Sequence, residues 1–379
     1  MSGRASKMTC MSLKSLEFFA GIGLARAGMA KAGIETVWAN DYDKHKQEMY
    51  KGQFGAGEYV LKDVHDVDPD EVPTADIAWS SSPCTDLSLA GGRIGLRTGR
   101  ESSAFFGFTK VLEGLGERRP RAVVLENVPG LASSHGGDDL RAAAQTFNEL
   151  GYSVDVVALD ARRWVPQSRQ RLFMIGITDP RGEGDLDTNI RPDWVSWLQT
   201  EKNLRTHITR LPRPPEPLTF GLSAVVEKLE DDDPSWWDPE RTRKFIDSMS
   251  PVQRARLDVL QHSDEPVART AYRRTRQGRP VWEMRSDDIS GCLRTARGGS
   301  SKQAIAFMGN GQVTVRWMTG REYARLMGAH DYTLTDIRQP QALYGFGDAV
   351  AVPVVEWVAK HMVAAQLDAS TVKATNYEE

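Results

Sequence analysis

Short apolar, β-rich runs alternate with helical patterns through the first half of the chain. The runs expected to form strands are 15–19, 35–39, 76–79, 121–128, 152–159 and 171–177. The segments with helical spacing are 24–32, 44–51, 103–117 and 138–150. Because strands that alternate with helices form sheets covered on both faces, this order predicts an α/β fold with a Rossmann-like, doubly wound sheet.

After about residue 179 the alternation is lost, and clusters of Pro, Trp, Arg and Asp replace it, such as LPRPPEP at 211–217 and DDDPSWWDPE at 231–240. About a hundred such residues exceed an ordinary loop, so they predict a second, smaller irregular domain with little regular helix. A linker is the alternative, but the tryptophans of this region argue for packing. They are Trp194, Trp197, Trp236 and Trp237. A helical pattern resumes at 337, and 350–365 is expected to form an amphipathic C-terminal helix.

The composition is that of a folded protein without a membrane or secretory signal. The chain has 379 residues, 40% of them hydrophobic, which is enough for one large and one smaller domain. It has no uncharged apolar stretch of membrane-spanning length. Cys10, Cys84 and Cys292 lie far apart without CxxC spacing, and the histidines are equally scattered. We therefore expect no disulfide framework, no metal and a cytoplasmic location.

Charge is unevenly distributed, although the net charge is only −3. Residues 227–240 hold seven acids and one lysine, whereas 268–302 hold nine Lys or Arg and three acids. The basic stretch is a candidate for contact with phosphates, and a solvated surface is the alternative.

Two features near the N-terminus suggest a nucleotide-like cofactor. The segment FFAGIG at 18–23 follows a predicted strand and opens a helix, where small residues let the backbone approach a ligand. The glycines alone fit an ordinary turn equally well. About 20 residues later a second strand ends in Asn40-Asp41-Tyr42, where nucleotide-binding folds hold ribose hydroxyls. Together the two features favour an adenosine-bearing cofactor.

Three further segments place reactive groups at the carboxyl edge of the sheet. Cys84 follows a predicted strand in Ser-Ser-Pro-Cys, a position suited to a nucleophile, although a lone Cys is more often a buried hydrophobe. Glu126 and Asn127 end another strand, where burial would raise the pKa of Glu126; an exposed acid or helix cap is the alternative. Strand alternation puts Gln167, Arg169 and Arg171 on one face, where the two arginines suit anion recognition or the orientation of a carboxylate. A solvated basic strand edge is the alternative.

Read in order, FFAGIG, SSPC, ENVPG and QSRQR resemble the motifs of the DNA (cytosine-5) methyltransferase family. The likeness extends to RTARGG at 294–299, TGREYARLMG at 319–328 and GFGDAVAVPVVEWVAKH at 345–361. It implies a class I methyltransferase fold with a discontinuous catalytic domain, 1–179 plus 337–379. Residues 180–336 would then form the target-recognition domain and hinge.

The resemblance implies roles for single residues. Cys84 would attack the cytosine C6, Glu126 would hold N3 and the exocyclic amine, and Arg169 and Arg171 would order the site, with Asn127 and Gln167 as structural supports. S-adenosyl-L-methionine would be the methyl donor and S-adenosyl-L-homocysteine the product. The implied cofactor-binding residues are Phe19, Gly21, Gly23, Asp41, Tyr42, Asp63, Val64, Pro83, Asp348 and Ala349, with Gly347 closing the pocket beside the last two. The expected DNA contacts are Arg294, Arg297 and Lys302.

Several positions depart from the family pattern. Asp41 stands where Glu is usual, Ser82 where a larger residue is usual, Asp348 where Asn is usual, and Thr85-Asp86-Leu87 where a Gln and an aromatic are common. None removes a catalytic group. A carboxylate at position 348 would weaken cofactor binding unless an ammonium or guanidinium group neutralised it.

The expected partner is double-stranded DNA, bound by a monomer and without a membrane. An RNA cytosine methyltransferase and a DNA-binding regulator without turnover are the alternatives. The hundred-residue insert favours DNA, and the intact catalytic residues disfavour a regulator. Restriction-modification, phage defence and an orphan epigenetic role remain open, and the recognition sequence cannot be deduced.

Overall fold

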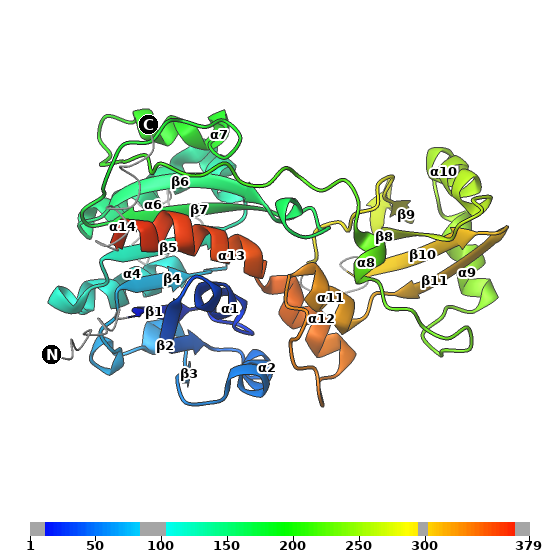
Figure 1. The fold of residues 1–379 in the computed structure, drawn as a ribbon, viewed down its shortest axis with the longest axis horizontal. Coiled ribbons are helices and arrows are strands. Elements are labelled where there is room, and N and C mark those ends of the chain that lie inside the picture. The colour runs from blue at the N-terminus through cyan, green and yellow to red at the C-terminus, as the bar shows by residue number, and fades with distance from the viewer. Residues whose placement is uncertain (1–11, 84–103, 295–301, 368–379) are drawn as a thin grey trace, which may run out of the picture.

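The computed structural model describes residues 12–83, 104–294 and 302–367, arranged around two separate sheets (Figure 1). A seven-stranded sheet forms the larger part, and a four-stranded sheet lies at the other end of the molecule. The expected active-site residue Cys84 and the expected DNA contact Arg297 lie outside the described residues.

The large sheet has the strand order β3-β2-β1-β4-β5-β7-β6. Its strands are β1 (Leu13–Phe18), β2 (Ile34–Asp41), β3 (Tyr59–Leu61), β4 (Ile77–Ser80), β5 (Ala122–Asn127), β6 (Ser153–Asp160) and β7 (Gln170–Ile177). All neighbours are parallel except β7, which runs antiparallel to both β5 and β6. Both faces of the central strands are buried, which explains their near-continuous apolar runs. The expected α/β class is confirmed.

Helices cover both faces of the large sheet. The helices of this part are α1 (Leu24–Lys31), α2 (Lys44–Phe54), α4 (Ala104–Gly114), α5 (Gly130–Ser133) and α6 (Asp138–Glu149). Neighbouring residues of one strand point to opposite faces, so Trp79 packs with α1 while Ala78 packs with α4 and α6. The carboxyl ends of β1, β2, β4 and β5 therefore meet at one edge between two packed layers.

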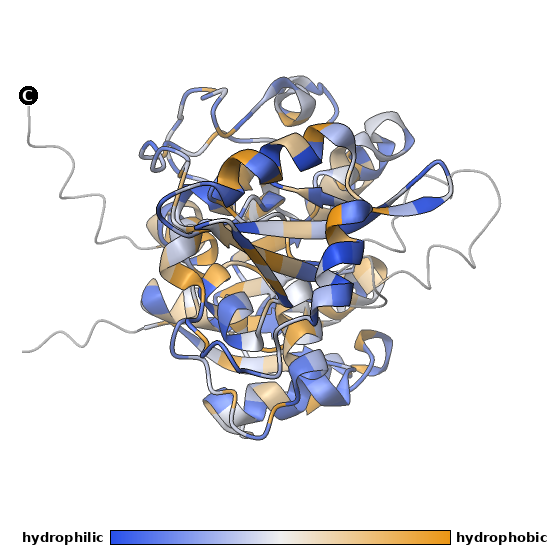
Figure 2. Cartoon of the chain, turned by 90° about the vertical axis from the view of Figure 1, so that its right-hand side faces the viewer, coloured by the Kyte–Doolittle hydropathy of each residue, from blue (hydrophilic) through white to orange (hydrophobic). Residues whose placement is uncertain are grey.

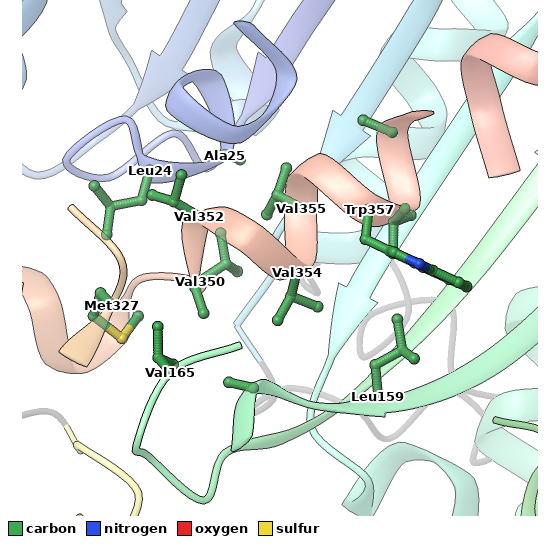
Figure 3. Packing of buried hydrophobic residues seen from close by; sticks show 14 of the residues in the cluster. Leu24, Ala25, Leu159, Val165, Met327, Val350, Val352, Val354, Val355 and Trp357 are labelled. Carbon is green, nitrogen blue, oxygen red and sulfur yellow. The ribbon is translucent and has the colours of Figure 1, made fainter. Parts of the chain in front are cut away.

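The C-terminal helix completes the core on the α1 side. It runs through α13 (Val352–Val358), a π-helical turn (Ala359–Ala364) and α14 (Ala365–Leu367). Figure 3 shows Val352 and Val355 of α13 directed toward Leu24 and Ala25 of α1, with Val354 toward the sheet. The expected C-terminal helix is therefore present, and 72% of the apolar window in Gln339–Leu367 is buried inside the protein, as in a core helix.

The smaller sheet is antiparallel, with the order β11-β10-β8-β9. Its strands are β8 (Val267–Arg276), β9 (Arg279–Met284), β10 (Gln303–Gly309) and β11 (Gln312–Trp317). Helices α9 (Pro239–Asp247) and α10 (Pro251–Gln261) pack on it around the rings of Trp237, Phe245, Trp282 and Trp317. The small domain thus has more regular structure than the expected irregular domain with little helix. Of the four tryptophans expected to pack there, Trp236 and Trp237 lie on the small sheet, whereas Trp194 and Trp197 pack against the large core.

The segments on either side of this small core pack against the large one. Val195 and Leu198, from α7 (Asp193–Ser196) and the 3-10 turn after it, join the core beneath β6. Short helix α8 (Leu222–Val225) and helices α11 (Gly320–Leu326) and α12 (Gln339–Asp348) join the core that contains α1 and α13. The boundaries 180 and 336 remain a prediction; by packing, the separate core of the small domain lies within 237–317.

Candidate active site

The glycine loop after β1 has positive φ angles, which glycine adopts easily and other residues rarely do. Gly21 and Gly23 have φ angles of 55° and 79°, and Phe19 has 56°. A Cβ at Gly23 would lie 2.4 Å from Phe54 and 2.8 Å from Tyr50, so no other residue fits there. The Gly21 amide donates a 2.9 Å hydrogen bond to the Asp41 carboxylate, which fixes the loop against the end of β2.

Charged side chains from three segments meet beside this loop. Asp41 also accepts a 2.9 Å hydrogen bond from the Asp43 amide, and burial raises its pKa while nearby Lys46 opposes the rise. The Lys46 ammonium lies 2.8 Å from the Asp348 carboxylate, at the end of α12. An ammonium group therefore neutralises the carboxylate that stands at position 348 in place of the usual Asn.

The other expected cofactor residues differ in how accessible they are. The Tyr42 ring is 60% exposed, next to buried Asp41, so its face is free to stack on a flat ligand. Asp63 caps the 3-10 helix Val64–Asp66 by accepting from the His65 amide. The Val64 side chain is buried against Gly107 of α4, so little of it faces the solvent. The glycine loop, Asp41 and Tyr42 together fit an adenosine-bearing group.

Glu126 and Arg171 form a buried ion pair at the end of β5. Arg171 Nε lies 3.0 Å from Glu126 Oε1, and the side chains are 15% and 8% exposed. They meet because β7 pairs with β5 in a register that places Glu126 opposite Phe173, two residues from Arg171. Burial raises the pKa of Glu126, while Arg171, Arg169 and a hydrogen bond from Ser81 oppose the rise. Burial therefore favours the protonated carboxyl group, and the two arginines favour the ionised one.

The segment that leads to Cys84 is fixed beside this ion pair. Ser80 ends β4 next to Leu125 of β5. The Trp79 indole donates a 3.1 Å hydrogen bond to the Ser81 hydroxyl, and the Asn127 amide donates one of 3.1 Å to the Ser82 carbonyl. Pro83, the last described residue before Cys84, is exposed at the same sheet edge.

Arg169 is buried and joins segments that are distant in sequence. Its guanidinium donates hydrogen bonds to the carbonyls of Leu293, Gly347 and Ala349 and, at 3.4 Å, to the Cys292 sulfur. Burial and nearby Arg171 lower the pKa of Arg169 to about 10. As expected, the two arginines converge, but Arg171 holds the carboxylate whereas Arg169 orders the backbone around it.

Gln167 and Cys292 lie next to Leu293, which accepts a hydrogen bond from Arg169. Fully buried Gln167 donates to the Leu326 carbonyl at 2.8 Å and accepts from the Leu293 amide at 3.1 Å, which agrees with a structural support. Burial opposes ionisation of the Cys292 thiol, but Arg169 and Arg171 outweigh it and lower its pKa. Cys292 is therefore a second thiol at the site.

The expected DNA contacts lie on the small-domain side. Arg294 is exposed and Lys302 is half-buried just before β10. The basic stretch also forms the β8–β9 hairpin, which projects with a hydrophilic tip (Figure 2). This hairpin carries Arg273, Arg274, Arg276 and Arg279, which the sequence analysis included only as part of a charged stretch.

Three residues of the site were not singled out from the sequence. Lys46 and Ser81 are ordinary polar residues whose partners come from other segments, so no local signal distinguishes them. Cys292 stands two residues before Arg294, and its position beside the family-like RTARGG segment was an available signal. Within the described residues, no three His, Cys, Asp or Glu side chains are grouped as metal ligands.

The chain matches a family model over nearly its whole length. The model describes a C-5 cytosine-specific DNA methylase and covers residues 13–364. Type II methyltransferase M.HhaI of Haemophilus parahaemolyticus is 27% identical over 348 residues, 92% of this chain and 93% of the relative. Orphan methyltransferase M.Rho11sI of Bacillus phage rho11s is 34% identical over 184 residues, 48% of this chain and 35% of the relative.

The fold is also that of solved methyltransferases. The crystal structure of S. pombe Dnmt2 methyltransferase superposes with a TM-score of 0.60 at 16% identity, covering 94% of this chain and 99% of that one. At this identity the likeness concerns the fold alone. With the family match over 13–364, the chain belongs to the C-5 cytosine-specific DNA methylases, which use S-adenosylmethionine, and it is a DNA (cytosine-5-)-methyltransferase.

Proposed function

We propose that this enzyme methylates C5 of a cytosine flipped out of a specific duplex DNA sequence, through a covalent bond between Cys84 and C6. The observation that carries the proposal is the buried Glu126–Arg171 ion pair beside the segment that leads to Cys84. A thiol and a carboxyl group at one sheet edge are what addition to the ring and stabilisation of its charge require.

The proposed steps use the chain's own residues on the base. The Cys84 thiolate adds to C6, and the displaced ring electrons are stabilised as protonated Glu126 donates to N3. C5 thereby becomes nucleophilic. After C5 has gained the methyl group it loses its proton to a base, and elimination of the Cys84 thiolate restores the aromatic ring. Arg171 keeps the Glu126 carboxyl oriented and limits the rise of its pKa.

The chain also supplies a cradle for the methyl donor. S-adenosyl-L-methionine, when bound, supplies an electrophilic methyl group and leaves as S-adenosyl-L-homocysteine. The glycine loop, Asp41 and exposed Tyr42 would hold the adenosine part, and Asp348 and Ala349 would close the pocket. Asp63, Val64 and Pro83 would line its rim. This assignment rests on the bond from the Gly21 amide to Asp41 and on the exposed Tyr42 side chain beside Asp41.

The small domain would bind the DNA. A cytosine stacked in a duplex is out of reach of Cys84, so the base must be extruded. The arginines of the β8–β9 hairpin and exposed Arg294 support contacts to phosphates, with Arg297 and Lys302 nearby in sequence. The match to a DNA methylase family favours DNA over RNA as the substrate. We further propose a cytoplasmic monomer in restriction-modification, phage defence or an orphan role.

The test is methyl transfer by a Cys84→Ala variant, with Cys10→Ala as the matched cysteine control. We expect Cys84→Ala to abolish methylation of duplex DNA and covalent trapping on 5-fluorocytosine DNA, while cofactor binding persists. Cys10→Ala should behave as the wild type. Unchanged methylation by Cys84→Ala would overturn the mechanism, and faster methylation of transfer RNA than of duplex DNA would overturn the substrate. Bisulfite sequencing of DNA from expressing cells would give the target sequence.

A further inference from the structure

Lys46 connects two carboxylates that come from distant parts of the chain. It lies in the first turn of α2, and its ammonium is 2.8 Å from the Asp348 carboxylate at the end of α12. The Tyr344 ring lies 5.3 Å from the same ammonium. A Cβ at Gly21 would be 3.8 Å from Lys46 Cδ, so the side chain lies directly against the glycine loop. Lys46 is thus part of the wall formed by this loop, α2 and α12.

The charges around Lys46 are only partly exposed to solvent. The side chains of Lys46 and Asp348 are 15% and 31% exposed, and Asp41 is buried. Burial alone would lower the pKa of Lys46, but Asp41 and Asp348 outweigh it and raise the pKa. Lys46 is therefore charged at neutral pH. Without it, Asp41 and Asp348 would lose the ammonium group that acts on both carboxylates.

Asp348 lies between the reacting groups and Asp41. Arg169 donates hydrogen bonds to the carbonyls on both sides of it, 3.2 Å to Gly347 and a second to Ala349. Arg169 acts electrostatically on Glu126, which marks the reacting end of the site. Under the proposed function, on which this inference rests, Asp41 marks the ribose, and the sulfur must face the reacting end. The amino-acid end of the cofactor, which is attached to that sulfur, then lies nearest Asp348.

We propose that Lys46 is a positioning residue for the amino-acid end of the cofactor. It neutralises Asp348 and so allows the cofactor carboxylate to enter a space that would otherwise repel it. Lys46 and Asp348 then act as one unit: an aspartate at 348 requires the lysine at 46, whereas an asparagine at 348 does not. The adenosine part of the cofactor is held by the glycine loop, Asp41 and Tyr42, so Lys46 acts on it only indirectly, through Asp41.

Calorimetric titration with two ligands tests this role without turnover. S-adenosylhomocysteine carries the amino-acid end, and 5′-deoxy-5′-methylthioadenosine lacks it. We expect Lys46→Met to weaken S-adenosylhomocysteine about 10- to 100-fold and methylthioadenosine less than about twofold. Adding Asp348→Asn should restore the S-adenosylhomocysteine affinity to within about threefold. Lys51→Met, which removes an exposed lysine from the same helix, is the control and should change neither affinity.

Three results would overturn the proposal. Equal losses of affinity for both ligands in Lys46→Met would mean that Lys46 only links α2 to α12. An unchanged S-adenosylhomocysteine affinity would mean that Lys46 does not position the cofactor. If Lys46→Met fails to fold, the Asp348→Asn variant alone still tests the proposal. A tenfold loss of S-adenosylhomocysteine affinity in that variant would mean that Asp348 itself holds the cofactor. If the wild type bound neither ligand, the proposed cofactor assignment would fail instead, before any variant was compared.

Discussion

The contact between α1 and α13 gives a sharp test of how tightly the large core is packed. Gly28 of α1 faces α13, and a methyl group there would lie 2.5 Å from Val355 Cβ and 2.7 Å from the Val352 carbonyl oxygen. Neither atom is the end of a flexible side chain. Gly28→Ala must therefore push the two helices apart or distort one of them.

The expected change in stability follows from two opposing effects. Overpacking a core with one extra carbon costs about 1–3 kcal/mol, and the backbone oxygen places this site in the upper part of the range. Alanine is favoured over glycine within a helix by about 1 kcal/mol. We expect Gly28→Ala to lower the free energy of unfolding by about 1–2 kcal/mol. Gly52→Ala in α2 is the matched control, because no atom lies within 4 Å of its added carbon.

The assay is urea unfolding followed by tryptophan fluorescence, with unfolding rates measured if refolding fails. Gly52→Ala should raise the free energy of unfolding by about 0.5–1 kcal/mol. Both variants replace a helical glycine by alanine, yet they should move the unfolding midpoint in opposite directions. A Gly28→Ala variant as stable as the wild type would refute the packing argument.

Three further predictions concern buried charge and DNA binding. Arg316 and Glu322 form a fully buried ion pair, so Arg316→Met should lower the free energy of unfolding by about 3–5 kcal/mol. In the same urea assay, a double variant that adds Glu322→Gln should recover part of this loss. Burial raises the pKa of Glu17 from 4.5 to about 8, so its contribution to stability is present below pH 4.5 and lost as the pH rises toward 8. The free energy of unfolding should fall more steeply over this interval in the wild type than in Glu17→Gln, by at most on the order of 5 kcal/mol; parallel curves would contradict this. Replacing Arg273 and Arg276 of the hairpin by Gln should weaken DNA binding, as measured by fluorescence anisotropy. It should also reduce the slope of log affinity against log salt concentration by about 1–2. An unchanged slope would exclude contact between these two arginines and phosphates.

The elements of the first half could be predicted because burial alone specifies them. Strands such as Ala122–Asn127 are covered on both faces, so their apolar runs report directly on the fold. The meeting of Glu126 and Arg171 could also be predicted in outline, since both lie at the ends of core strands. The small sheet could not be predicted in this way. The second half of β8 is rich in arginine and pairs with β9, while its first half is held by β10, some thirty residues later, so its sequence lacks the apolar pattern of a core strand.

Contacts across long sequence separations explain the remaining gaps. Arg169 was expected to order the site, but its acceptors at 293, 347 and 349 are set by tertiary packing and not by local spacing. The same holds for Lys46, whose partner Asp348 lies at the other end of the chain. The sequence raised the question of which group neutralises Asp348, and the fold was needed to answer it.

The helix that closes the core is made long after the strands that it covers. Val352–Leu367 covers α1, which precedes it by about 320 residues. Roughly 170 residues separate the end of β7 from α13, so at about 5–20 residues per second the nascent large sheet waits some 10–35 s for its cover. Throughout that time an apolar face is open to chaperones and to other nascent chains. Translation stopped before this helix leaves that face uncovered, so the large core closes only once Val352–Leu367 has been made.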